Sequence, residues 1–300
     1  MKRKINRVGQ NTLTVSLPSS WARMLNLKPG EEIDVDEKGH SLIVSRGRVP
    51  EKKEVTVHLT DKDHFAKRLL GMPYIQGYDV IRVTYNDPEV YPLVRDCVNR
   101  IMLGFEIIDH GKDACVLKNI AEGIDSEFES NQRKFILQVK NIIENLKEAV
   151  EKKDDSLIEH IMMLDQSIDK LCVFMRRILV MKGYRDDSRG KSYYYIVNLL
   201  ETISDRCRDV CKHIKESGKF PSKNVLAIIN EVKKSFETFY DLYYKPEINK
   251  VIVLKKHYSK VKPKIYEMMS KNPNEAIPLH HLLGVLEIIQ SMSEEMECPA

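Results

Sequence analysis

RVGQNTLTVSLPSSWARMLNLKPGEEI, residues 7–33, decides how the N-terminal part of this chain folds. Residues 11–17 alternate apolar and hydroxyl side chains with a period of two, which predicts a strand buried on one face. Pro18 ends the strand, and Ser19 or Ser20 can cap a short helix over residues 21–26. The stretch therefore predicts a strand, a tight break and a short helix.

Residues 32–36 and 41–45 follow and flank turn residues at 37–40, which is typical of a β-hairpin. The N-terminal domain, residues 1–48, then holds three or four short strands and one short helix. Roughly 45 residues bury too little surface for a stable core without disulfides or a metal. We therefore expect two copies to interleave as a homodimer.

The same segment is basic. Residues 1–30 contain no acidic residue, and their cations are Lys2, Arg3, Lys4, Arg7, Arg23 and Lys28. A local positive surface is typical of a protein that binds a phosphate backbone. A basic arm also serves solubility alone, so charge by itself leaves both interpretations open.

The motifs in 7–9, 14–18, 21–22 and 27–33 resemble the AbrB/SpoVT swapped-hairpin DNA-binding family. The resemblance implies an interleaved dimer that binds a pseudo-palindromic DNA operator. Carried over by position, the DNA contacts would be Lys2, Arg3, Lys4 and Arg7, with Arg23 a weaker candidate. The alternative use of this fold, an antitoxin, needs a short disordered acidic tail, whereas this chain continues with about 250 mostly structured residues.

Residues 52–122 alternate strands and helices. Strands are predicted at 55–59, 79–84, 105–108 and 115–117, and helices from 60–63 to 70 and from 86–88 to about 103. This pattern predicts a small, loosely ferredoxin-like α+β domain. With no glycine-rich phosphate loop, a rigid spacer or dimerisation module is favoured over a small-ligand sensor.

From residue 124 to 297 the apolar period becomes 3.6, which predicts an all-helical domain. Two helices precede a polar loop at 183–190, a third covers 192–217, and a break follows at 218–221. Three more helices are predicted at 222–243, 246–271 and 276–297. The fold class is thus multidomain α+β, ending in a pair of three-helix bundles with repeats at 124–217 and 221–297.

Carboxylates in this domain are candidate ligands for a metal. Asp165 and Asp169 lie four residues apart on an apolar stripe, and Glu201, Asp205 and Asp209 repeat that spacing. Like charges at this spacing destabilise a helix, and buried carboxylates need partners. A bridging divalent or trivalent cation would satisfy them, with Fe, Mn or Mg suiting oxygen ligands better than Zn. Arg176, Arg206 or Arg208 could neutralise them instead.

Asp165-x-x-x-Asp169 and Leu200-Glu-Thr-Ile-Ser-Asp205 resemble the metal-binding motifs of the PhoU phosphate-signalling family. The second repeat departs from that family, because Lys245, Asn249 and Ser291 stand where acids are expected. Only Glu287 remains there, as a weaker candidate. The two resemblances imply an archaeal-type fusion that regulates transcription of phosphate-uptake genes.

Alternatives remain. A PhoU-type adaptor could bind a phosphate transporter or a signalling kinase while the N-terminal domain only dimerises, and a metal-dependent phosphohydrolase would use the same carboxylates. We expect no enzyme, because no nucleophile, base and oxyanion set is visible. The six scattered cysteines predict reduced core thiols rather than a zinc site at Cys207 and Cys211. Without a signal peptide or transmembrane segment, we expect a cytoplasmic protein.

Overall fold

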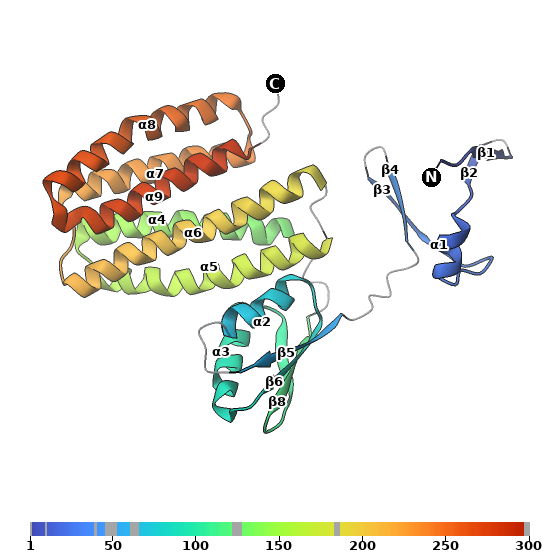
Figure 1. The fold of residues 1–300 in the computed structure, drawn as a ribbon. Helices are drawn as coiled ribbons and strands as arrows, with labels where there is room; N and C mark the ends of the chain where they lie inside the picture. Colours follow the sequence, from blue (N-terminus) through green and yellow to red (C-terminus); the bar gives the residue numbers. More distant parts are fainter. Residues whose placement is uncertain are drawn as a thin grey trace. The chain divides into compact units, whose positions relative to one another are not determined.

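The computed structural model describes residues 2–9, 11–38, 41–45, 53–60, 66–121, 128–182 and 187–296. The chain divides into two compact units, residues 1–51 and 52–300 (Figure 1). The first is called the N-terminal unit. Within the second, residues 53–121 form the middle module and residues 128–296 form the helical domain.

The N-terminal unit consists of two hairpins and a short helix. Strands β1 (Ile5–Val8) and β2 (Thr12–Val15) pair antiparallel, α1 (Ser19–Met24) follows, and β3 (Asp34–Lys38) pairs with β4 (Ser41–Ser45). Part of the predicted turn, residues 39–40, lies outside the described residues. The predicted strand, helix and hairpin are confirmed, and β1 is an additional strand.

The N-terminal unit has no core in a single chain. None of its described side chains is buried, and Ile5, Leu13 and Met24 are 68%, 66% and 73% exposed. Isolated two-stranded hairpins are marginal in water because they cannot bury enough apolar surface. That this unit needs a second copy stays a prediction.

The middle module is a four-stranded sheet with two helices. In chain order it contains β5 (Glu54–Leu59), α2 (Ala66–Ile75), β6 (Val80–Tyr85), a 3-10 turn η1 (Pro88–Val90), α3 (Tyr91–Ile101), β7 (Phe105–His110) and β8 (Ala114–Asn119). The strand order is β5-β6-β8-β7, with β5 and β6 parallel and the other pairs antiparallel. Leu70, Ile81 and Leu117 are fully buried in its core.

The predicted ferredoxin-like arrangement of this module is wrong. The elements follow the order β-α-β-α-β-β, so a helical crossover joins the neighbouring parallel strands β5 and β6, and the β7–β8 hairpin ends the sheet. Helix α2 also continues past Gly71 and Pro73 to Ile75, beyond its predicted end at residue 70. Tyr74, which is fully buried and donates to the Leu103 carbonyl over 2.9 Å, explains why packing overrides these helix breakers.

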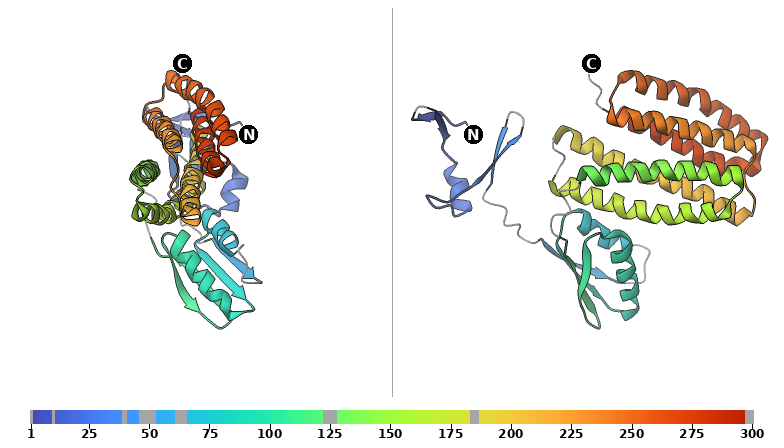
Figure 2. Two further views of the ribbon diagram at one scale, coloured as in Figure 1. Left: turned by 90° about the vertical axis from the view of Figure 1, so that its left-hand side faces the viewer. Right: turned by 180° about the vertical axis from the view of Figure 1, so that it is seen from behind.

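Six long helices form the helical domain (Figures 1 and 2). They are α4 (Phe128–Lys152), α5 (Asp155–Lys182), α6 (Asp187–Ser217), α7 (Lys223–Tyr244), α8 (Ile248–Lys271) and α9 (Ala276–Glu294). Gly218, with φ of 63°, ends α6 in the left-handed conformation that favours glycine. The predicted helices are confirmed except that α6 begins at Asp187, inside the predicted polar loop; residues 183–186 lie outside the described ones.

The two predicted three-helix bundles share one hydrophobic core. Buried side chains from all six helices form a single contiguous cluster, which includes Phe135 of α4, Ile203 of α6 and Leu286 of α9. Helices α6 and α9 run side by side through the middle of the domain in both figures. The helical domain is thus one packed body rather than two separate bundles.

Helix α5 joins the helical domain to the middle module. Arg177 of α5, only 4% exposed, donates to the carbonyls of Tyr74 and Tyr78 over 2.6 and 2.8 Å. Its second terminal nitrogen lies 3.1 Å from Asp79, and the guanidinium packs over the Tyr74 ring. The middle module is therefore anchored on the helix that carries Asp165 and Asp169. Among the described helices, none is long and apolar enough to cross a bilayer.

Candidate functional site

Helices α5 and α6 bring the predicted carboxylates together. The acidic cluster consists of Asp165, Asp169, Glu201 and Asp205. Carboxylate oxygens of Asp165, Asp169 and Asp205 all lie within 4.8 Å of one another. Asp165 is 2% exposed, and the other members are half-buried. The apolar periodicity of α5 explains this placement, because Asp165 lies on the same face as the buried Ile161.

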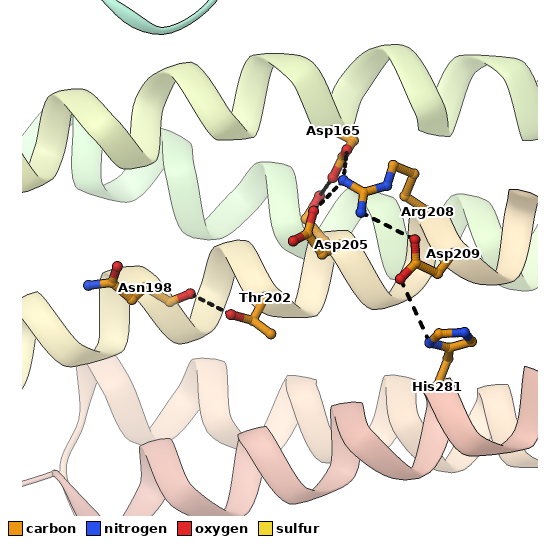
Figure 3. Close-up of polar contacts among 8 residues, drawn as sticks. Asp165, Asn198, Thr202, Asp205, Arg208, Asp209 and His281 are labelled. Atoms are coloured by element: carbon orange, nitrogen blue, oxygen red, sulfur yellow. Dashed lines mark hydrogen bonds and ion pairs between the residues drawn. The ribbon is translucent and has the colours of Figure 1, made fainter. Parts of the chain in front are cut away.

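Arg208 neutralises part of this cluster (Figure 3). Its Nη1 lies 2.9 Å from Asp165 Oδ2 and also donates to Asp205, and its Nη2 lies 3.2 Å from Asp209 Oδ1. Ser204, fully buried, donates its hydroxyl to the remaining oxygen of Asp165 over 2.6 Å. Asp165 is therefore satisfied by a charge-assisted hydrogen bond and a neutral one, as a buried carboxylate requires. Of the three candidate arginines, Arg208 is the one for which ion pairs to these carboxylates are found in the described part of the chain.

Among the residues that the structure describes, no partner comparable to Arg208 is found for Asp169 or Glu201. Asp169 Oδ1 is buried without a hydrogen-bond partner, and no ion pair to Glu201 is found among the described residues. Burial and the nearby Asp165 raise the pKa of Asp169 to about 6. Burial and the nearby Asp205 raise the pKa of Glu201 to about 7. Near neutral pH the cluster therefore carries more negative charge than Arg208 compensates.

Asp209 points away from the cluster toward α9. Its Oδ2 lies 3.9 Å from Nδ1 of His281, which Arg206 contacts at 3.3 Å. Burial lowers the pKa of His281, against the opposing effect of Asp209. Figure 3 shows His281 reaching Asp209 from the opposite side to Arg208. Asp209 thus links α6 to α9 and is not a member of the acidic cluster.

The donor set of the acidic cluster fits a hard cation in part. All of its available ligands are carboxylate oxygens, as Mg²⁺ and Mn²⁺ prefer, and Asp169 offers a buried oxygen with no partner among the described residues. Asp165, Asp169 and Asp205 would hold the ion. The Arg208 guanidinium, in contact with both Asp165 and Asp205, competes for the same oxygens.

Two other predicted features do not join this cluster. Glu287 of α9 accepts from Tyr258 over 2.8 Å and lies 3.4 Å from the Lys262 ammonium, so it is already paired with α8. Cys207 and Cys211 are buried, and burial raises the pKa of Cys211 to about 12. Because metals bind the thiolate, this environment opposes a zinc site. Cys298 lies outside the described residues.

The candidate DNA contacts all lie on the surface of the N-terminal unit. Lys2, Arg3, Lys4, Arg7 and Arg23 are exposed. Arg23 donates to the Ser19 carbonyl over 3.3 Å, one turn earlier in α1. Arg7 pairs with Leu13 across the β1–β2 hairpin and therefore shares a face with Ile5 and Val15. Arg7 thus borders an exposed apolar surface made by Ile5, Leu13 and Val15.

Sequence reasoning missed three contributors to the charged site. Ser204 is a buried polar residue inside an apolar helix face, a pattern that could have suggested a buried acceptor nearby. His281 comes from α9 and carried no local signal. Lys67 of α2 opposes the rise in the pKa of Asp169, so the middle module contributes charge near the cluster.

Comparisons with known proteins support the resemblances seen in the sequence. Residues 7–56 match the family model described as antidote-toxin recognition MazE, bacterial antitoxin. Residues 133–214, which include both acidic motifs, match the PhoU domain model. The N-terminal unit is therefore MazE/AbrB-like, the helical domain contains a PhoU domain, and both families are regulatory or adaptor types.

Among solved structures, the crystal structure of PhoU from Pseudomonas aeruginosa is similar to this chain. The two chains share 18% sequence identity. The match covers 57% of this chain and 90% of the PhoU chain, with a TM-score of 0.38. A comparison with curated proteins finds no match.

Proposed function

We propose that this chain is a DNA-binding transcriptional regulator of phosphate uptake, in which the helical domain senses a partner or ligand. The proposal rests on the surface of the N-terminal unit. None of its described residues is buried. Four of its cations, called the N-terminal quartet, are exposed: Lys2, Arg3, Lys4 and Arg7. Pairing two copies would bury the apolar hairpin surface and place eight of these cations on one dimer. The MazE/AbrB-like match supports a nucleic-acid or protein partner for this unit.

The test is a salt titration of duplex DNA from upstream of the chain's own gene. About eight phosphate contacts predict a slope of log K against log salt near −7. Changing the N-terminal quartet to glutamine should bring the slope close to zero. The matched control changes the α8 quartet, Lys255, Lys256, Lys260 and Lys264, to glutamine, which removes the same charge from exposed sites elsewhere. Equal loss in both variants would contradict N-terminal DNA contacts.

The phosphate link rests on the PhoU match and needs a test of its own. Deletion of the gene should abolish the phosphate dependence of transcripts for phosphate uptake. Restoring the N-terminal quartet variant should fail to rescue it, while restoring the wild-type gene should rescue it. Transcripts that still respond to phosphate in the deletion strain would contradict the proposed pathway.

The second candidate is a protein-binding adaptor, which the antitoxin description of the matched family favours. In that case the N-terminal unit would dimerise and bind a protein, and the helical domain would bind a transporter or signalling kinase. Absence of any DNA retardation at low salt, with the dimer intact, would favour the adaptor.

A bound metal is part of the proposal. The acidic cluster is offered as a site for Fe, Mn or Mg, held by Asp165, Asp169 and Asp205, with Glu201 one turn from Asp205 on α6. Its support is the excess of buried carboxylate over Arg208. Such an ion would act as a structural and regulatory charge between α5 and α6.

A further inference from the structure

Helix α8 differs from the other helices of its domain in its charge. Its 24 residues contain seven lysines, no arginine and a single acid, Glu267. Only Leu254, Val261 and Ile265 are buried, and they form the side that packs against α7 and α9. The side of this helix opposite these three residues is exposed, and Figure 1 shows α8 at the edge of the helical domain.

The lysines of α8 divide into two groups. Lys250, Lys262 and Lys271 are paired with Glu247, Glu287 and Glu267 at 3.7, 3.4 and 2.5 Å. The α8 quartet is exposed, and no ion pair to it is found among the described residues. Lys256, Lys260 and Lys264 continue a four-residue row that begins with Ile248 and Ile252, so they lie along one side of the helix.

Aliphatic and aromatic side chains accompany these charges. Ile248, Ile252, Val253 and Tyr266 are 55%, 43%, 54% and 51% exposed. Exposed apolar side chains that adjoin unpaired lysines on one helix are typical of a surface that lies against a lipid interface. A purely solvated helix face has no need of four exposed apolar residues.

The kind of charge distinguishes between anionic partners. Arginine is favoured where a carboxylate or a nucleic-acid phosphate is bound with defined geometry, and α8 has none. Lysine is depleted at protein–protein interfaces. Mobile ammonium groups with aliphatic neighbours suit a diffuse anionic surface that offers no fixed geometry.

We propose that the outward face of α8, formed by the α8 quartet with Ile248, Ile252, Val253 and Tyr266, docks on an anionic lipid bilayer. The lysines attract the headgroups, and the apolar side chains enter the interface. Ile248, Ile252 and Val253 do so near the N-terminal end of the helix, and Tyr266 does so near its C-terminal end. Association is peripheral and salt-sensitive, because charge attraction to the headgroups is screened within a Debye length.

The test is co-sedimentation of the full chain with vesicles of phosphatidylcholine alone or mixed in equal parts with phosphatidylglycerol. At low salt the chain should bind the mixed vesicles and not the neutral ones. Changing the α8 quartet to glutamine should weaken binding on the order of 100-fold or more, since each lysine near an anionic surface contributes several-fold. The N-terminal quartet variant, which loses the same charge, should retain binding.

A second variant tests the apolar contribution. Ile252→Ser with Val253→Ser keeps every charge and should weaken vesicle binding roughly tenfold, because aliphatic burial contributes to interfacial affinity. The α8 quartet variant and the double serine variant are both checked for native helix content by circular dichroism. Lack of wild-type binding to anionic vesicles overturns the proposal.

Two further outcomes would also overturn it. Vesicle binding lost only with the N-terminal quartet would assign the membrane contact to that unit. Duplex-DNA affinity that falls with the α8 quartet, together with vesicle binding that is unchanged by the serine variant, would make α8 a nucleic-acid surface instead.

Discussion

At the scale of single residues, the acidic cluster makes the helical domain sensitive to pH. The pKa of Asp169 is raised to about 6 and that of Glu201 to about 7. Between about pH 4 and 7, these two carboxyl groups are therefore still protonated in the folded state but already ionised in the unfolded state. Stability of the metal-free protein should therefore fall as pH rises through this window.

The Asp169→Asn variant should lose less stability than the wild type as the pH rises. At pH 7.5 the variant should melt about 2–4 °C above the wild type, and its melting temperature should depend less on pH. Differential scanning calorimetry across the pH range measures both. The contrasting variant is Asp154→Ala. Asp154 accepts hydrogen bonds from the Ser156 and Leu157 amides at the start of α5, and these bonds lower its pKa. This variant should melt at a lower temperature than the wild type.

An unchanged dependence of the melting temperature on pH in Asp169→Asn would contradict the assignment.

Metal binding at the acidic cluster gives a second residue-scale prediction. Asp165→Ala combined with Asp205→Ala should eliminate bound Fe or Mn measured by elemental analysis while leaving the dimer intact. Arg208→Gln should do the opposite and tighten Mn²⁺ binding in calorimetric titration, because it removes the cation that now contacts Asp165 and Asp205. Unchanged metal content in the double variant would contradict metal binding at the acidic cluster.

At the scale of elements, Arg177 determines how the middle module is held on α5. Its guanidinium satisfies two carbonyls and Asp79 in a nearly dry environment. Arg177→Met keeps the apolar stem but removes the hydrogen bonds to the Tyr74 and Tyr78 carbonyls and to Asp79, which typically costs about 2–4 kcal/mol. Scanning calorimetry should resolve a separate, lower transition for the middle module.

The matched control is Lys170→Met on the same helix, whose ammonium reaches the Asn99 carbonyl over 2.8 Å at an exposed position. It should leave the melting profile nearly unchanged. A single unaltered transition in Arg177→Met would show that apolar packing alone couples the two parts.

At the scale of the whole molecule, the N-terminal unit should fold only as a dimer. Light scattering should give a mass near twice 34.9 kDa for the full chain. Leu13→Glu places a charge on the apolar face of β1 and β2, and should produce a monomer with DNA affinity reduced more than tenfold. Met163→Glu, at an equally exposed apolar position of α5 (67% against 66%), is the control. A monomeric wild type would contradict the interleaved dimer.

Periodicity and spacing in the sequence by themselves determined where most helices and strands lie and that Asp165 and Asp169 face the bundle interior. These features are local, because they depend on side-chain direction along one element. Only the tertiary structure decided that Arg208 and Ser204 partner Asp165, that Asp209 turns to His281, and that Arg177 anchors the middle module. Such pairings depend on helix rotation and on contacts between residues up to 103 positions apart, which no local pattern encodes. The sheet order differs from the ferredoxin-like prediction for the same reason, since strand neighbours are chosen by packing across the whole module.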